Sequence, residues 1–139
     1  MCSSDLDGLI VPVIHDADQL SVAGLNARVA DLAERARSNR LRLQELQGGT
    51  ITVNNTGSFG SIVAASIINT PEVANINLDA IVRRPDVLQT PVGEVIAIRS
   101  MTNVPLAFDH RATDGAQAGR FLQSVKHWLE AIGPETPIY

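Results

Sequence analysis

The sequence predicts one α+β domain built on a mixed sheet. Three observations indicate this: helical apolar spacing recurs in two segments, strand-forming segments lie between them, and 139 residues are enough for one domain with a buried core. The elements follow the order strand, helix, several strands, helix, which is typical of an α+β or mixed-sheet domain.

The first strand and the first helix are marked by their apolar residues. Leu9–Ile14 is a short, nearly continuous apolar run, which predicts a buried strand. Ser21 can cap the helix that follows, in which apolar residues recur at three- and four-residue steps from Val22 to Ala36. Residues 41–46 continue the pattern irregularly until two consecutive glycines break it.

A glycine-punctuated loop follows the second strand. Thr50–Asn54 is a strand by composition, and the TGSFGS after it is a loop. This loop lacks the GK[ST] ending of a phosphate-binding loop, so nucleotide binding is not expected. Ile62–Ile68 is apolar enough to be buried, but its composition does not distinguish a strand from irregular structure.

Several strands fill the middle of the chain. Val73–Val82 alternates apolar residues with Asn and Asp, which predicts a half-buried strand that stops at the Arg-Arg-Pro of residues 83–85. The Pro-Val-Gly of residues 91–93 predicts a hairpin turn. Val95–Met101 and Val104–Phe108 are strand-like and only two residues apart, which predicts one long strand with a bulge.

The last helix has clear start and stop signals. Asp114 and Gln117 form a D-x-x-Q capping box, and apolar residues then follow helical spacing from Ala118 to Ile132. A glycine and a proline at 133 and 134 end the pattern. A helix is therefore expected to start just after the histidine at position 110.

The composition argues against several classes of partner. The formal net charge of −4 disfavours a nucleic-acid-binding surface, which needs clustered Lys and Arg. The only basic cluster is Arg35, Arg37, Arg40 and Arg42. We interpret it as a solvated helix face or a subunit contact. The single cysteine, Cys2, excludes a disulfide framework and a cysteine metal cage, so we expect a reducing compartment, the cytoplasm. No apolar run approaches the roughly 20 residues that span a bilayer.

The N-terminal end and the surface carry two further expectations. Residues 1–6, MCSSDL, match nothing downstream and are predicted to be a foreign or disordered tail. The mean hydropathy of +0.08 is high for so acidic a chain and indicates a buried subunit contact. Trp128, on the last helix, is expected to lie in the core or at an interface.

FDHRATDG, residues 108–115, places a histidine between two aspartates where a strand gives way to a helix. Histidine has an unperturbed pKa of about 6.5, so His110 is a natural base for a thiol or hydroxyl, provided that Asp114 fixes its orientation. The alternative is that Asp114 only caps the helix, Asp109 and Arg111 form a surface ion pair, and His110 is incidental.

Other catalytic and metal sites are not indicated. His15 and His127 lack the ligand spacing of a zinc site, so no metal is expected. The serines lack a G-x-S-x-G elbow, which disfavours a Ser-His-Asp hydrolase.

Four ordered motifs carry a resemblance to a known family. They are GGTITVNNTGSFGS at 48–61, IINTPEVA at 67–74, IVRRP at 81–85 and DHRATDG at 109–115. Together they resemble the catalytic domain of dihydrolipoamide acyltransferases, the core-forming components of 2-oxoacid dehydrogenase complexes, from about Asp7 to Glu130. The NNTGSFGS and VIAIRSM stretches are most similar to the branched-chain type, and acetyl and succinyl transfer stay open as alternatives.

The resemblance implies a fold like that of chloramphenicol acetyltransferase, in trimers that build a hollow core. It implies acyl transfer from a dihydrolipoyl thioester to coenzyme A in a channel between two subunits, with His110 as the general base and Asp114 ordering the site. Where the family places a serine or threonine to donate a hydrogen bond to the tetrahedral oxyanion, this chain has Asn54. The other candidate donors are Asn55, Thr56 and Ser58.

The resemblance also implies partners and missing parts. The partners are the decarboxylating 2-oxoacid dehydrogenase and the dihydrolipoamide dehydrogenase, and the lipoyl group is carried on a domain absent from this chain. The family's catalytic domain starts further upstream, so residues 7–139 are expected to be its C-terminal part, inactive or poorly folded alone. Two alternatives stay open: a free-standing chloramphenicol-type acetyltransferase and a non-catalytic core scaffold.

Overall fold

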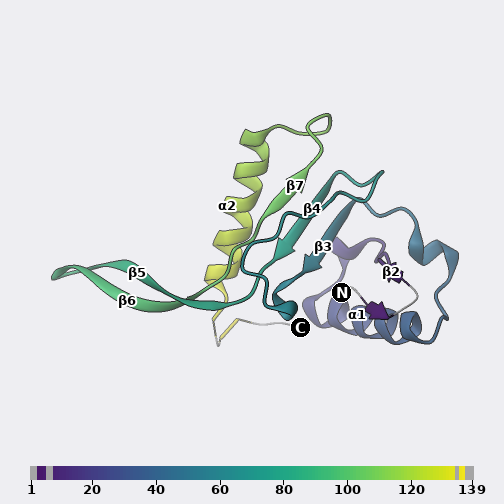
Figure 1. The fold of residues 1–139 in the computed structure, drawn as a ribbon, viewed down its shortest axis with the longest axis horizontal. Coiled ribbons are helices and arrows are strands. Elements are labelled where there is room, and N and C mark those ends of the chain that lie inside the picture. Colours follow the sequence, from purple (N-terminus) through teal and green to yellow (C-terminus); the bar gives the residue numbers. More distant parts are fainter. Residues whose placement is uncertain (1–2, 6–7, 134, 137–139) are drawn as a thin grey trace.

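The computed structural model describes residues 3–5, 8–133 and 135–136 and has an α+β fold, as predicted (Figure 1). The helices are α1, Val22–Arg37, and α2, Gly115–Ala131. The strands are β1, Ser3–Asp5; β2, Gly8–Ile10; β3, Ile51–Asn55; β4, Ala74–Leu78; β5, Val82–Thr90; β6, Gly93–Met101; and β7, Leu106–Phe108. Short 3₁₀ helices span Ala17–Gln19, Leu43–Leu46 and Gly57–Phe59.

A three-stranded mixed sheet forms the centre of the fold. Its order is β3-β4-β7, with β3 parallel and β7 antiparallel to the central β4. Ala74 of β4 pairs with Ile51 on one side and with Phe108 on the other, which sets the register of all three strands. Helix α2 runs alongside β7 (Figure 1). The turn of residues 109–114 joins the end of β7 to the start of α2.

Strand β4 is buried on both faces. Ala74 and Ile76 point to one face, and Asn75, Asn77 and Asp79 are buried on the other. The prediction of one half-buried strand over Val73–Val82 is therefore wrong. The alternation is real, but the polar face is covered by the segment of residues 61–68, whose carbonyl at position 67 accepts a hydrogen bond from the Asn75 amide.

The strand boundaries around the hairpin also differ from expectation. Residues 79–81 separate β4 from β5, and β5 runs through the Arg-Arg-Pro at which a strand was predicted to stop. Pro85 is tolerated because a strand of a two-stranded ribbon has an unpaired edge. The hairpin turn at 91–93 is confirmed, since Thr90 pairs with Gly93 across it and donates its hydroxyl to the Gly93 carbonyl at 2.7 Å.

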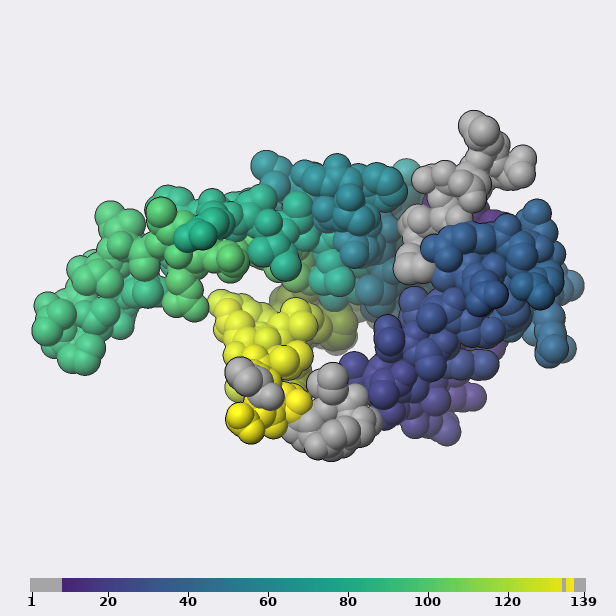
Figure 2. All heavy atoms as spheres, turned by 90° about the horizontal axis from the view of Figure 1, so that it is seen from below, coloured from purple at the N-terminus to yellow at the C-terminus, as the bar shows by residue number. Residues whose placement is uncertain are grey.

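The β5–β6 hairpin projects from the rest of the chain (Figures 1 and 2). Nine register pairs join the two strands, from Val82 with Met101 to the turn. The prediction of one bulged strand through residues 95–108 is wrong, because β6 pairs with β5 whereas β7 pairs with β4. The linker between them is held elsewhere: Thr102 donates its hydroxyl to the Asp79 carbonyl, and Asn103 donates its amide to the Ile62 carbonyl.

The N-terminal half departs from the sequence prediction in its details. Ser21 caps α1 as predicted, with its hydroxyl accepting from the backbone N–H of Gly24 at 3.1 Å. The predicted strand Leu9–Ile14 is paired only as far as position 10, and it pairs with β1. Residues 3–5 of the predicted tail thus form a strand, whereas positions 1, 2 and 6 lie outside the described residues, and the origin of that segment stays a prediction.

Charged and apolar residues are distributed differently from expectation. In the basic cluster, Arg37, Arg40 and Arg42 are exposed, as a solvated face requires. Arg35 is half-buried and binds Asp31 at 2.7 Å and Glu45 at 2.6 Å, which joins α1 to the 3₁₀ turn at 43–46. Ile62–Ile68 is irregular, and Ile67 is 90% exposed. The predicted burial of this segment is therefore wrong for the isolated chain. Trp128 is exposed and does not belong to the core. None of the described helices is long and apolar enough to cross a bilayer.

Candidate active site

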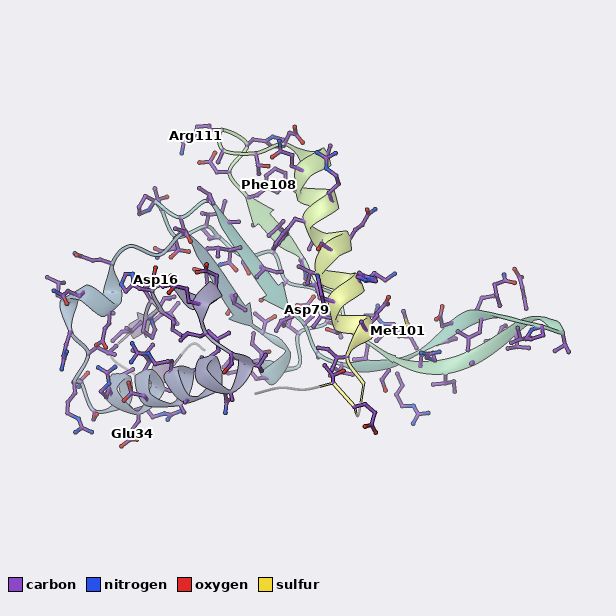
Figure 3. All side chains as sticks on the ribbon, turned by 180° about the vertical axis from the view of Figure 1, so that it is seen from behind. Asp16, Glu34, Asp79, Met101, Phe108 and Arg111 are labelled. Carbon is purple, nitrogen blue, oxygen red and sulfur yellow. The ribbon has the colours of Figure 1, made fainter. Side chains whose placement is uncertain are left out.

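His110 lies in the turn between β7 and α2. The carbonyl of Asp109 accepts from the backbone N–H groups of Ala112 and Thr113 at 2.9 and 3.1 Å, and the N–H of Asp109 donates to the chain just before β4. The His110 ring is exposed and lies 4.8 Å from the ring of Phe108, centroid to centroid. Figure 3 shows Phe108 and Arg111 close to the first turn of α2. The turn therefore presents an imidazole on a fixed backbone.

A pocket of about 380 Å³ opens beside this ring. One wall is the turn itself, from Phe108 to Arg111, and the other is the chain from Ile68 through Glu72. The buried carboxylate of Glu72 accepts hydrogen bonds from the hydroxyl of Thr52 and, at 3.2 Å, from the amide of Asn69. Sequence reasoning did not identify Glu72, although it lies within the IINTPEVA motif. The pocket is thus built from two of the motifs.

The two aspartates around His110 have separate structural roles. Arg111 binds Asp109 through its guanidinium at 2.7 Å and through its backbone N–H at 2.8 Å. These hydrogen bonds, the guanidinium first, lower the pKa of Asp109 to about 2. Asp114 caps α2 by accepting from the N–H of Gln117 at 2.8 Å. In the part of the chain that the structure describes, no hydrogen bond links Asp114 to His110.

The candidate oxyanion donors lie at the end of β3. Asn54 donates its amide to the Ser66 hydroxyl at 3.4 Å, and its side-chain oxygen accepts from the next backbone N–H at 3.0 Å. Thr56 donates its hydroxyl to the Asp79 carboxylate at 3.0 Å. Ser58 donates its hydroxyl to the Asn55 carbonyl at 3.2 Å. The hydroxyl hydrogens at 56 and 58 and an amide hydrogen of Asn54 are therefore all used within the fold.

His110 and Asn54 are not brought together within one chain. The residue before His110 donates its backbone N–H to the carbonyl of Val73, just before β4 begins. Asn54 is level with Asn77, near the other end of β4. Five strand positions at about 3.3 Å each separate the two groups by roughly 16 Å along the sheet. The sequence could not reveal this separation, because it depends on the pairing of three strands.

The described residues contain no cluster of acidic, cysteine or histidine side chains that could hold a metal ion. His15 bonds to the carbonyl of Gln44 through a ring nitrogen at 3.0 Å, and His127 lies beside Trp128 on α2. A second, larger groove of about 860 Å³ runs between α1 and β3 and shares Glu72 with the pocket at His110. Its lining is mainly apolar.

Comparisons with known proteins agree with the fold and the motifs. The model of the 2-oxoacid dehydrogenases acyltransferase catalytic domain matches residues 2–136. The lipoamide acyltransferase component of the branched-chain alpha-keto acid dehydrogenase complex of Bacillus subtilis is 44% identical over 133 residues, which are 96% of this chain and 31% of that protein. This chain thus spans about a third of the length of that relative.

Solved structures share the fold. A probable dihydrolipoamide acetyltransferase from Listeria monocytogenes superposes with a TM-score of 0.91 at 42% identity, covering 99% of this chain and 58% of that one. The dihydrolipoamide acetyltransferase of Azotobacter vinelandii, studied for the catalytic roles of a serine, a histidine and an asparagine, gives 0.83 at 35% identity, covering 94% and 52%. The predicted fold class is confirmed by these structures. The chain belongs to the family of 2-oxoacid dehydrogenase acyltransferase catalytic domains.

Proposed function

We propose that the protein that carries this chain transfers an acyl group from a dihydrolipoyl thioester to coenzyme A, as the acyltransferase component of a 2-oxoacid dehydrogenase complex. The observation that carries the proposal is the imidazole of His110, which lines a pocket on a turn held by hydrogen bonds at both ends. Coenzyme A is a substrate here, and the lipoyl group arrives on another domain. The motifs are most similar to the branched-chain type, but the relatives do not single it out: a branched-chain component is 44% identical and an acetyltransferase component of a pyruvate dehydrogenase complex is 50% identical, so acetyl transfer stays a second candidate.

The chemistry requires one base. A thiol has a pKa of about 8.5, so an imidazole can take its proton as the sulfur attacks the thioester carbonyl. The carbonyl oxygen then becomes an oxyanion. As the tetrahedral intermediate collapses, the carbon bond to the dihydrolipoyl sulfur breaks, and that sulfur recovers the proton from His110. Acyl-coenzyme A and the free dihydrolipoyl thiol result.

Asn54 is the proposed donor to the oxyanion. It occupies the inward-facing position of β3, level with the buried Asn77. An amide can donate as a hydroxyl does, and losing one such donor typically lowers kcat by about 10²- to 10³-fold. Asp114 is proposed to order the site through the helix cap. In the Azotobacter vinelandii protein the histidine and asparagine are also four residues apart, and an amide oxygen caps as a carboxylate does.

The active site is proposed to lie between two copies of the chain. The separation of roughly 16 Å between His110 and Asn54 along the sheet is too large for both to act on one carbonyl within a single chain. A second copy that supplies the amide resolves this. Exposed apolar side chains on the hairpin and on residues 62–67 support such a contact. A homotrimer that builds a larger core, with the two dehydrogenases as partners in the cytoplasm, completes the proposal.

Replacing the base tests the reaction. In the complete protein, His110→Ala is expected to lower acyl transfer from acyl-dihydrolipoamide to coenzyme A by about 10²- to 10⁴-fold, because the thiol loses its proton acceptor. His127→Ala, on the outer part of α2, is the matched control and should keep wild-type activity. Full activity of the His110→Ala protein would contradict the mechanism and favour a scaffold role.

Mixing two inactive variants tests the shared site. Subunits with His110→Ala and subunits with Asn54→Ala are unfolded together and reassembled. If each site takes its histidine from one copy and its amide from the next, about a quarter of the sites in a random mixture carry both groups, and activity returns to about that level. Sites built within single chains would give no recovery.

A further inference from the structure

A buried polar cluster fastens the end of β3 to β4. Thr56 donates its hydroxyl to the Asp79 Oδ1 at 3.0 Å and accepts from the Asn77 amide at 2.8 Å. The same amide donates to Asp79 Oδ1 at 2.6 Å. Asp79 is 4% and Asn77 1% exposed, so the cluster belongs to the interior. Figure 3 shows Asp79 at the opposite end of the sheet from Phe108 and Arg111.

The backbone fixes the same turn. The N–H of Thr56 donates to the Leu78 carbonyl at 3.1 Å, which continues the pairing of β3 with β4. Gly57 then passes so close to Asp79 that an added Cβ would lie 2.6 Å from the Asp79 carbonyl carbon, so only glycine fits. The hydroxyl of Thr102 donates to that carbonyl at 2.8 Å. Side chains and backbone thus hold this turn in one position.

The cluster sits two residues after the proposed oxyanion donor. Asn54 is level with Asn77 on the same face of the sheet, and Thr56 follows on that face. We propose that Asp79 is a positioning residue for acyl transfer: through Thr56 it fixes the end of β3 and thereby the direction of the Asn54 amide. This inference rests on the proposed function, in which Asn54 stabilises the oxyanion.

The cluster is poorly suited to a purely stabilising role. Asp79 Oδ2 and Asn77 Oδ1 are buried and have no hydrogen-bond partner among the described residues. Burying an unpaired carboxylate or amide oxygen opposes folding, and apolar side chains would join two strands without that penalty. The cluster instead fixes the orientation of the Thr56 hydroxyl, which donates to Asp79 and accepts from Asn77. A defined geometry is what an oxyanion donor needs.

Removing the link tests the inference. In the complete protein, Thr56→Val keeps the side-chain shape but loses the hydroxyl. It is expected to lower kcat about tenfold with KM for the acyl donor changed less than about twofold, because a misdirected amide weakens only the transition state. Asp79→Ala should act in the same direction. Thr56→Ser keeps the hydroxyl and should restore wild-type kcat. Wild-type kcat in Thr56→Val would overturn the proposal.

A coupled pair of variants separates positioning from general damage. If Thr56 acts through Asn54, then adding Thr56→Val to an Asn54→Ala protein should change kcat less than about twofold. A further tenfold fall in that background would overturn the proposal. Thr90→Val is the matched control, because that hydroxyl also donates to a loop carbonyl, at the hairpin turn, and its kcat should stay at the wild-type value.

The outcomes also separate this inference from the proposed function. If His110→Ala and Asn54→Ala both lower kcat but Thr56→Val does not, the inference fails and the acyltransferase proposal stands. If Asn54→Ala leaves kcat unchanged, the assignment of the oxyanion donor fails and the inference fails with it. Should Asp79→Ala not assemble, Thr56→Val decides alone, because it leaves the carboxylate its bond from Asn77.

Discussion

In the turn at 109–111, the outer two side chains hold the backbone and the middle one faces the pocket. Asp109 and Arg111 form an ion pair with two kinds of hydrogen bond, so each charge is balanced locally. His110, between them, is left to face the pocket beside Phe108. The surface ion pair and the helix cap of the simpler sequence interpretation are both present. Both interactions also hold the backbone that carries His110, so they are compatible with its proposed role as the base.

At the residue scale, the hydrogen bonds from Arg111 lower the pKa of Asp109. Arg111→Met is expected to raise the pKa of Asp109 from about 2 toward 3.8, because the guanidinium hydrogen bond is the largest cause of the low value. Arg99→Met, on the hairpin, is the control. NMR titration of the carboxyl group measures the pKa of Asp109 in each variant. An unchanged pKa in Arg111→Met would contradict the prediction.

The sign of the pH effect follows from this shift. The pKa of Asp109 is lower in the folded chain than in the unfolded one, so the pair stabilises the turn fully above about pH 4. That contribution is lost as the pH falls toward 2. In Arg111→Met the stability of the turn should therefore depend less on pH in this acidic window.

At the scale of elements, helix α2 and strand β7 form one unit through the cap. Asp114 accepts from the Gln117 N–H, while the Gln117 side-chain oxygen accepts from the Thr113 hydroxyl at 3.0 Å. The first turn of α2 is thus fixed to the turn that carries His110. Ala118, one turn into the helix, is buried and anchors this end of α2.

Two variants of Asp114 separate capping from charge. Asp114→Ala is expected to lower the free energy of unfolding by about 1 kcal/mol, because a backbone N–H loses its acceptor. Asp114→Asn keeps an acceptor oxygen, so its stability and its acyl transfer should stay close to wild type. Denaturant unfolding and the transfer assay measure the two effects. An inactive Asp114→Asn protein with normal stability would show that the carboxylate charge itself acts on His110.

At the scale of the whole molecule, the hairpin exposes apolar surface that a single chain does not cover. Val87 pairs with Ile96 and Pro85 with Ile98 on one face, where Ile96 is 78% and Ile98 64% exposed. A two-stranded hairpin is marginally stable in water by itself. The arm that projects in Figure 2 is therefore expected to rest on another copy.

Charges on this face should weaken assembly without unfolding the chain. Ile96→Lys combined with Ile98→Lys is expected to shift the complete protein toward smaller species, because both side chains are exposed in one copy and we expect a neighbouring copy to cover them. Analytical ultracentrifugation measures the shift. Leu43→Lys, equally exposed at the other end of the molecule, is the control. An unchanged distribution of species in the double variant would exclude this face from the subunit contact.

Features that depend on a few neighbouring residues were predictable from the sequence. Ser21 and Asp114 cap their helices, the turn at 91–93 closes a hairpin, and the TGSFGS segment is a loop. The pocket at His110 was not predicted, although its two walls lie in motifs that carry the family resemblance. The burial of β4 was less predictable. Its alternating pattern indicates a half-buried strand, but other segments of the chain cover both of its faces.

The sequence by itself determined the fold class, the family and the identity of the candidate base, because these follow from residue types at short spacing. Only the tertiary structure decided which strands pair, and hence that His110 and Asn54 lie at opposite ends of one sheet. It also decided that Asp79 holds the end of β3. Strand pairing joins residues that are distant in the chain, and its register is set by packing that no local pattern contains.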